Sequence, residues 1–210
     1  QLNEQLSELS ADYKTLADTI SKKRKTAAKK LQKQVEQQLQ QLAMANCQLS
    51  IQLSPKTDNV PHANGNEDIA FLVSTNPGQE PQALAKIASG GELSRISLAI
   101  QVITAKTSAI PTMIFDEVDV GIGGAVAEVV GNLLQELGEQ GQVLCVTHQP
   151  QVASKGHQHL YVSKTATKNS VSTQLKTLND DDKIEEIARM LGGIAITDQS
   201  LAHAKEMLAH

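Results

Sequence analysis

Residues 112–117 of this 210-residue chain read TMIFDE, a short apolar run that ends in two adjacent carboxylates. The run follows Pro111 and predicts a buried strand over residues 112–115. In open α/β sheets, ligands bind at the carboxyl ends of the strands. Asp116 is therefore a candidate ligand for a hydrated Mg²⁺, and Glu117 is a candidate to orient or deprotonate an attacking water. An acidic strand end that merely faces solvent is the simpler alternative.

A second apolar run predicts a neighbouring strand that ends at a histidine. Residues 142–146 read QVLCV and are followed by Thr147 and His148. If the two strands are parallel, His148 lies at the same sheet edge as Asp116. A histidine there can hydrogen-bond a terminal phosphate or the attacking water, although a lone histidine at a strand end is more often incidental.

A third motif, SGGELSR at residues 89–95, places two glycines at the start of a predicted helix. Helix N-termini present unpaired N–H groups and the positive end of the helix dipole. Gly90 and Gly91 allow an anion to approach the backbone closely, and the Ser89 hydroxyl adds a donor. The motif therefore suits a phosphate, and a plain N-cap with a tight turn is the alternative of equal weight.

The pattern around these motifs predicts an α/β fold, with a mostly parallel sheet and flanking helices. We expect strands over residues 48–53, 69–73, 112–115 and 142–146, and a closing antiparallel pair over 160–164 and 171–176. We expect helices over residues 92–106, 125–137 and 180–191, and a last one from about residue 197.

The first 46 residues follow a different pattern, which predicts one long helix to about Ala45. A heptad series of apolar residues runs through Leu2, Leu6, Leu9, Tyr13, Leu16 and Ile20, and resumes at Leu31, Val35, Leu39 and Leu42. So narrow a stripe requires a partner helix, which this chain does not supply. We therefore expect a coiled-coil arm over residues 1–46 and a head over residues 47–210.

Charge is unevenly distributed along the chain. The net charge is -4, whereas the predicted arm is positive and carries eight of the nineteen basic residues. Its densest run, Lys22, Lys23, Arg24 and Lys25, is a candidate contact with the DNA backbone. A solvated coiled-coil flank is the more common meaning of such a run. With two Phe, two Tyr and no Trp, the composition argues against a single-strand binder built on stacked bases.

The remaining composition excludes several other classes. Cys47 and Cys145 are far apart and suggest a reducing compartment, so a cytoplasmic location is expected. No apolar stretch approaches the roughly 20 residues that span a bilayer, and no secretory signal begins the chain. Because the chain begins within an amphipathic repeat and without Met, it is expected to be part of something longer.

In this order and spacing, the three motifs resemble the second half of an ABC-type ATPase head. The SGGELSR stretch is similar to the signature motif, residues 114–117 to the end of the Walker B strand, and His148 to the switch histidine. The longer stretches ASGGELSR (88–95), FDEVDVGI (115–122) and VTHQPQVA (146–153) look like the RecN family of bacterial DNA-repair proteins, relatives of the SMC chromosome proteins. NPG at 76–78 and ARMLGG at 188–193 fit as well.

The resemblance implies ATP and Mg²⁺ as cofactors and heads that form a homodimer around ATP. It implies that Asp116 holds Mg²⁺ through water, that Glu117 polarises the attacking water and that His148 senses the γ-phosphate. Asp119 and Gly123 would lie in an interface loop. The signature residues that would face the nucleotide of the partner head are Ser89, Gly90, Gly91 and Glu92.

The chain departs from the family pattern in two places. No glycine is followed by Lys-Ser or Lys-Thr, so the Walker A phosphate loop is missing and would lie in a separate N-terminal lobe. Gly123 stands where many ABC heads have an aspartate.

The function implied is part of a nucleoid-associated ATPase that repairs DNA double-strand breaks, with heads that bind or bridge DNA ends and no membrane partner. Alone, the chain is expected to be inactive. The alternatives are a non-catalytic coiled-coil scaffold and the ATPase subunit of a transporter.

Overall fold

The computed structural model describes residues 1–58, 60–87, 89–107, 110–167, 170–193 and 195–209, with only the backbone at residues 106, 165–167, 170 and 171. The chain divides into two compact units, residues 1–88 and 89–210, and each is described by itself. The strands that follow the long helix belong to the first unit. The division therefore falls later than the boundary at residue 46 that the sequence suggested.

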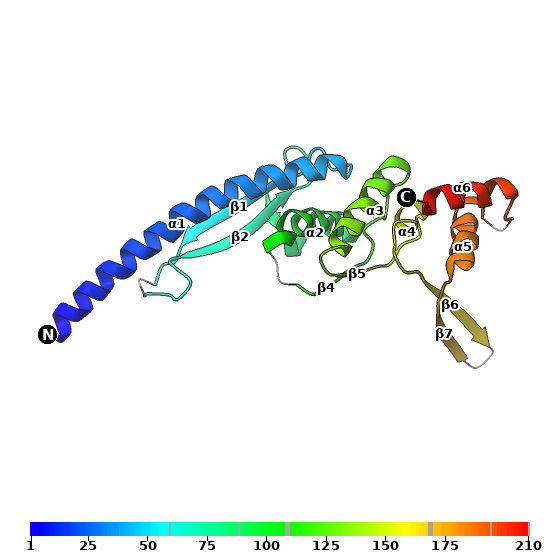
Figure 1. Ribbon diagram of the computed structural model, residues 1–210. Helices are drawn as coiled ribbons and strands as arrows, with labels where there is room; N and C mark the ends of the chain where they lie inside the picture. Colours follow the sequence, from blue (N-terminus) through cyan, green and yellow to red (C-terminus); the bar gives the residue numbers. More distant parts are fainter. Residues whose placement is uncertain (59, 88, 108–109, 168–169, 194, 210) are drawn as a thin grey trace. The chain divides into compact units, whose positions relative to one another are not determined.

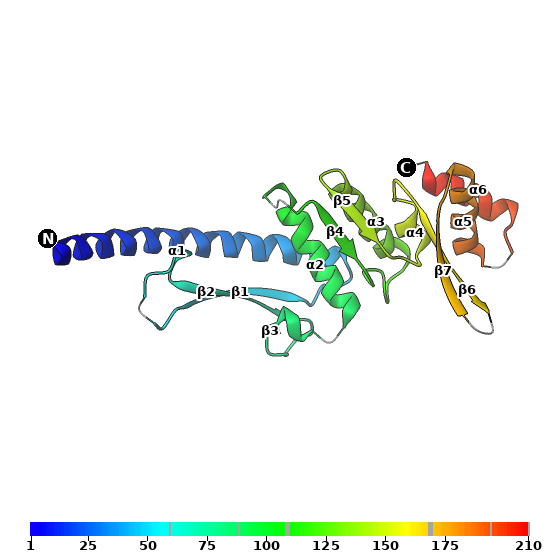
Figure 2. The ribbon, with the colours of Figure 1, turned by 90° about the horizontal axis from the view of Figure 1, so that it is seen from below.

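The first unit is one long helix with an antiparallel sheet beside it. Helix α1 covers Leu2–Gln41, and strands β1 (Gln48–Pro55), β2 (Glu67–Ser74) and β3 (Gln82–Ala83) pair in that order. A single 3₁₀ turn, η1 (Leu84–Lys86), follows β3. Figures 1 and 2 show α1 running alongside β1 and β2 from two directions.

The apolar series along α1 serves two different purposes. Leu2, at 83% exposure, and the next three leucines of the series, Leu6, Leu9 and Leu16, are exposed, as expected for a coiled-coil seam without its partner. Val35 and Leu39 are fully buried in the part of α1 that packs on β1. There, the Gln32 side chain donates to the Leu49 carbonyl (3.0 Å). The second half of the series is therefore matched to the chain's own strand, which corrects the expectation of a partner helix there.

The loop between β1 and β2 is also tied to α1. The Tyr13 hydroxyl accepts the N–H of His62 at 2.8 Å, and Arg24 donates to the Asn64 carbonyl at 2.7 Å. Arg24 also lies 3.5 Å from the Glu67 carboxylate. These contacts fix the hairpin against the middle of the helix.

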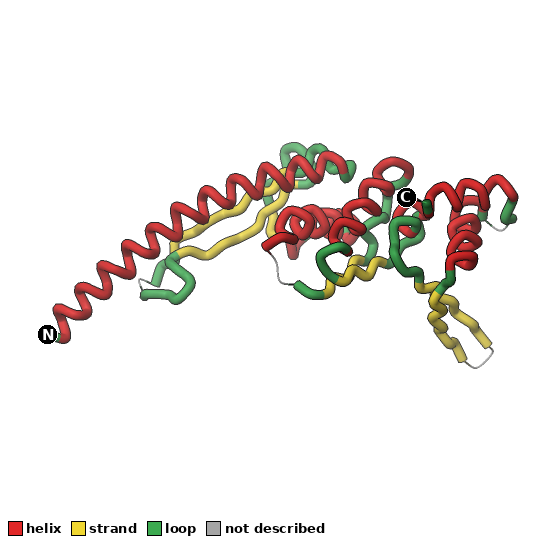
Figure 3. The backbone as a smooth tube through the Cα atoms, in the orientation of Figure 1, coloured by secondary structure: helices red, strands yellow, loops and turns green. Residues whose placement is uncertain are grey.

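The second unit contains the α/β part of the chain. Its elements are α2 (Gly90–Thr104), η2 (Ala105–Thr107), β4 (Thr112–Phe115), α3 (Gly124–Gly138), β5 (Gln142–Cys145), α4 (Pro150–Ala153), β6 (Leu160–Thr167), β7 (Ser170–Thr177), α5 (Asp180–Gly192) and α6 (Asp198–Leu208). Strands β4 and β5 are parallel, whereas β6 and β7 form a separate antiparallel hairpin (Figure 3).

The α/β class with a long N-terminal helix is confirmed, but the parallel sheet is small. Among the described residues, β4 and β5 are the two strands that pair in parallel. Parallel strands are normally buried on both faces. Here Ile114 is 70% exposed and Val146, just after β5, is 63% exposed.

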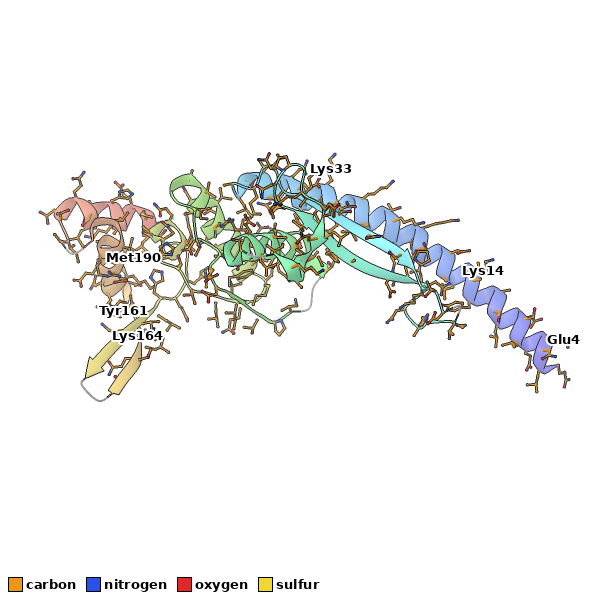
Figure 4. All side chains as sticks on the ribbon, turned by 180° about the vertical axis from the view of Figure 1, so that it is seen from behind. Glu4, Lys14, Lys33, Tyr161, Lys164 and Met190 are labelled. Carbon is orange, nitrogen blue, oxygen red and sulfur yellow. The ribbon has the colours of Figure 1, made fainter. Side chains whose placement is uncertain are left out.

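Helices α5 and α6 form a small core of their own. Ile187, Ala188 and Ala204 are buried, and Met190, labelled in Figure 4, packs against them. The Asn179 side chain caps α5 by accepting the N–H of Asp182, and α5 ends at Gly193 with a positive φ of 73°. Within the described parts of the chain, no helix is both long and apolar enough to cross a bilayer.

Candidate functional site

The carboxyl ends of β4 and β5 bring two of the sequence motifs together. Phe115 pairs with Cys145, and the N–H of Val146 donates to the Phe115 carbonyl at 2.9 Å. Asp116 and His148 therefore follow their strands at the same edge of the sheet, as the sequence predicted. Both side chains are exposed there.

Asp119 connects the two loops at this edge. Its side chain is almost fully buried, at 2% exposure, and one oxygen, Oδ2, accepts the hydroxyl of Thr147. The same oxygen accepts the backbone N–H groups of His148 (3.2 Å) and Gln149 (3.3 Å). It also lies 3.6 Å from Nδ1 of the His148 imidazole. The loop after β5 is thus folded around a carboxylate from the loop after β4.

The N-terminus of α2 lies against the loop that carries Glu117. The Ser89 hydroxyl caps the helix by accepting the N–H of Glu92 at 3.3 Å. A Cβ built on Gly90 would overlap Oε2 of Glu117, so the carboxylate occupies the space that a side chain at position 90 would fill. The positive end of the helix dipole favours an anion at this place. The sequence did not predict this contact between the signature stretch and Glu117 of the same chain.

Two further side chains of α2 anchor the same loop. The Ser94 hydroxyl donates to the Asp116 carbonyl at 2.7 Å, and Nη1 of Arg95 donates to the Val120 carbonyl at 2.8 Å. Arg95 is buried, and this burial lowers the pKa of its guanidinium, although Glu92 opposes the shift. The loop also lies close to Gly91, since a Cβ there would be 3.3 Å from both the Glu117 and the Val120 carbonyl oxygens.

Asp116 has the exposure and chemistry of a carboxylate that holds a hydrated cation. It lies exposed at the strand end, and its Oδ1 accepts the N–H of Glu117 at 2.9 Å, which fixes the side chain. In the described residues, no cluster of three or more His, Cys, Asp or Glu side chains forms a metal cage. A single carboxylate is nevertheless sufficient for Mg²⁺, which keeps several waters and takes its remaining ligands from phosphates.

The residues expected in an interface loop differ in exposure. Gly123 is exposed and precedes α3 as its N-cap, whereas Asp119 is buried and directs its carboxylate to the loop after β5. The expected place of both residues in an interface loop stays a prediction. The sequence did not predict this organising role of Asp119, nor the roles of Thr147 and Gln149. The sequence feature that could have indicated this role is that Asp119 is flanked by two apolar residues, Val118 and Val120.

The basic run of α1 does not act as one surface. Lys22, Lys23 and Lys25 are exposed, and Lys33, labelled in Figure 4, lies on the side of the helix away from β1 and β2. Arg24 is instead only 28% exposed and is bound to the β1–β2 loop. Its guanidinium contacts the Asn64 carbonyl and the Glu67 carboxylate, and its expected DNA contact stays a prediction.

Comparisons with known proteins agree with the motif content of this site. No protein-family model matches the chain. It is 48% identical over 208 residues to the DNA repair protein RecN of Xylella fastidiosa (strain 9a5c), an alignment that covers 99% of the chain and 37% of that relative. The chain matches the C-terminal part of RecN. The RecN of Haemophilus influenzae (strain ATCC 51907 / DSM 11121 / KW20 / Rd) is 50% identical over 192 residues, covering 91% of the chain and 34% of that relative.

Solved structures support the fold assignment. The Smc head domain with a coiled coil and joint derived from Pyrococcus yayanosii is 16% identical, with a TM-score of 0.53. The alignment covers 89% of the chain and 35% of that structure. At this identity the similarity establishes only that the chain shares the fold of that head domain with its coiled coil. The chain spans little more than a third of the length of the RecN relatives it matches.

Proposed function

We propose that the chain is the C-terminal, catalytic half of an ATPase head in a RecN-like protein that repairs DNA double-strand breaks. The observation that carries the proposal is the meeting of Asp116, Glu117 and His148 at one sheet edge, with the N-terminus of α2 against the same loop. The printed name of the RecN relatives, DNA repair protein, supports the biological role.

The residues of this edge fit the requirements of phosphoryl transfer, which mainly needs positioning and charge neutralisation. Asp116 would hold Mg²⁺ through water, and bound Mg²⁺ would neutralise charge on the phosphate oxygens. Glu117 has an exposed carboxylate that can orient a water and accept its proton. To do so, its side chain must leave the N-terminus of α2. His148, at 66% exposure, is open to the γ-phosphate.

The same proposal assigns the N-terminus of α2 to the nucleotide of a second head. Ser89 and Gly90 are exposed there, where helix N–H groups and a hydroxyl favour a phosphate. The phosphate loop must come from another segment, because no Walker A sequence is present in the 210 residues. We propose that the exposed apolar edge at Ile114, Leu144 and Val146 is the surface that this missing lobe covers.

Glu117→Gln tests the catalytic assignment in a chain extended to the full length of the RecN relatives. The substitution keeps the size of the side chain and removes the base, so ATP turnover should fall by roughly 100-fold or more. Size-exclusion chromatography with ATP should then show trapped dimers. Glu139→Gln is the matched control, because Glu139 is exposed at the end of α3. Unchanged ATP turnover in Glu117→Gln would show that Glu117 is not the base.

We also propose that the exposed lysines of α1 contact the DNA backbone. Lys22, Lys25, Lys29 and Lys33 recur at helical spacing, all are exposed, and no acidic residue lies between Asp18 and Glu36. This gives the helix a continuous positive stripe of the kind that neutralises phosphates.

Charge reversal tests whether these lysines contact DNA directly or affect binding only through the net charge of the chain. Lys22, Lys23 and Lys25 are changed together to Glu, and Arg24 is retained because it holds the β1–β2 loop. DNA affinity should fall at least tenfold, and its dependence on salt should become shallower. The control changes Lys86, Lys164 and Lys205 to Glu, which alters the net charge equally at exposed sites elsewhere. Fluorescence anisotropy measures the DNA affinity of both variants. Equal losses of affinity would show that the lysines of α1 are only a solvated surface of the helix.

A further inference from the structure

We infer that Asp119 is the positioning residue for His148, fixing which nitrogen of the imidazole carries the hydrogen. The inference rests on the proposed function, in which His148 meets the γ-phosphate or the attacking water. It concerns a contact within the second unit, so it can be examined without any nucleotide. Asp119 touches neither nucleotide nor water in this role and acts through His148.

The geometry around Asp119 is that of a fixed carboxylate. Three donors converge on Oδ2, namely the Thr147 hydroxyl and the N–H groups of His148 and Gln149. The side chain is 2% exposed, so competing water is largely excluded. A buried carboxylate with several donors is held firmly in place, because each lost hydrogen bond would leave a buried charge less well satisfied. The position of Oδ2 is therefore set by the protein.

That oxygen lies on the Nδ1 side of the His148 ring, 3.6 Å from the nitrogen. The distance is longer than a direct hydrogen bond, yet a carboxylate at this place still favours a hydrogen on Nδ1. Such contacts often tighten when a substrate binds. In the neutral ring, Nε2 is then left with its lone pair.

A second, independent contact selects the same tautomer. The side-chain amide nitrogen of Gln149 lies 3.4 Å from Nε2 of His148 and also donates to the Ile122 carbonyl at 2.9 Å. An amide nitrogen is a donor only, so the Nε2 it approaches must act as the acceptor. Asp119 on one side and Gln149 on the other thus hold the ring with its hydrogen on Nδ1 and with Nε2 as an acceptor.

The test is the tautomer of His148, measured by long-range ¹H–¹⁵N NMR on the 210-residue chain, at a pH where the ring is neutral. The wild-type protein should show mainly the Nδ1–H form. Asp119→Asn keeps an oxygen that can accept the backbone N–H groups but removes the charge, so the ratio of Nδ1–H to Nε2–H should fall roughly tenfold. Asp181→Asn is the control, since Asp181 is an exposed aspartate in the first turn of α5.

Each outcome decides the assignment. An unchanged tautomer ratio in a folded Asp119→Asn variant would show that Asp119 only holds the backbone of the loop, and would overturn the inference. If that variant does not fold, the wild-type spectrum still decides, because a predominant Nε2–H form contradicts the inference directly. Neither result depends on ATP turnover, so failure here is distinct from failure of the proposed ATPase function.

Discussion

Glu117 has a backbone conformation that residues other than glycine seldom adopt, with φ at 58°. Strained residues of this kind cluster at functional sites, where the surrounding structure maintains them. Here the strained backbone turns the chain sharply after β4 and brings the Glu117 carboxylate to Gly90. The residue proposed as the base is thus held at the helix N-terminus that is proposed to receive a phosphate. An incoming phosphate would repel the carboxylate from this position.

Cys145 provides a test of the electrostatics at the same edge. Burial, together with the nearby carboxylates of Asp119 and Asp116, raises the pKa of its thiol from 9.0 to about 12. Only the thiolate reacts readily with alkylating agents. Iodoacetamide at pH 8 should therefore modify Cys145 in the native chain on the order of a thousandfold more slowly than in the denatured chain. Peptide mass spectrometry distinguishes Cys145 from Cys47.

The same pKa shift has a defined effect on stability. Between pH 9 and pH 12, the unfolded chain ionises the thiol while the folded chain retains its proton. The contribution of Cys145 to the free energy of unfolding is therefore fully present below pH 9 and is lost as the pH rises toward 12. A native thiol that reacts as fast as the denatured one at pH 8 would contradict this account.

At the scale of elements, α3 packs closely against α4. A Cβ on Gly131 would lie 2.8 Å from the backbone oxygen of Gln151 and 3.2 Å from Cα of Val152. The obstacle is backbone, which cannot turn aside as a flexible side chain can. α4 directly follows the loop that carries His148, so the fit of Gly131 against α4 helps to support the site.

Gly131→Ala should therefore lower the free energy of unfolding by about 1–3 kcal/mol, the usual range for overpacking. Gly138→Ala, on the same helix, is the matched control. Its nearest contact would be His157 at 3.7 Å, an ordinary separation, so the change should stay within about 1 kcal/mol. Urea denaturation followed by circular dichroism measures both variants. Equal effects of the two substitutions would show that α3 and α4 can separate without cost.

The sequence predicted elements best where a periodic pattern meets clear boundaries. β4 has the predicted limits residue for residue, because Pro111 and the acidic pair bound its apolar run. α1 ends at Gln41 rather than near Ala45, and the one-turn helix α4 and the short strand β3 were not predicted. Elements this short carry too few residues to show a period. Whether an apolar stripe packs on a strand or on another helix depends on tertiary partners that periodicity does not identify.

For the candidate site as well, local patterns in the sequence predicted some residues, whereas roles that depend on distant contacts were not predicted. The motifs located Asp116, Glu117 and His148, because strand ends place polar residues at a predictable edge. The roles of Asp119 and Arg24 depend on contacts 29 and 40 residues away along the chain. Such contacts follow from how the loops close, which composition and spacing do not reveal.

At the scale of the whole molecule, several apolar side chains remain uncovered. Leu160, Val162 and Leu175 lie on one face of the β6–β7 hairpin and are exposed, as are Ile114 and Val146 at the parallel pair. Figure 4 labels Tyr161 and Lys164 on the same hairpin. Two-stranded sheets are at best marginally stable alone. These surfaces are consistent with the proposal that another part of the protein completes the head.

The nucleotide affinity of the isolated chain tests this proposal. Without a Walker A loop, the 210 residues supply no cradle for the β- and γ-phosphates. Isothermal titration calorimetry should detect no micromolar binding of Mg-ATP to this chain. Addition of the missing N-terminal part should produce such binding. Micromolar binding by the isolated chain would show that the phosphate contacts are not divided between two lobes.

The contacts of Tyr13 and Arg24 with the β1–β2 loop set a limit on the arm. Tyr13 belongs to the heptad series, and its hydroxyl is already bound to the chain's own β1–β2 loop. A second strand of the coiled coil can run beside Leu2, Leu6 and Leu9, but it meets the hairpin at the next position of the series. The bound loop therefore limits how closely a partner helix can approach α1 at Tyr13.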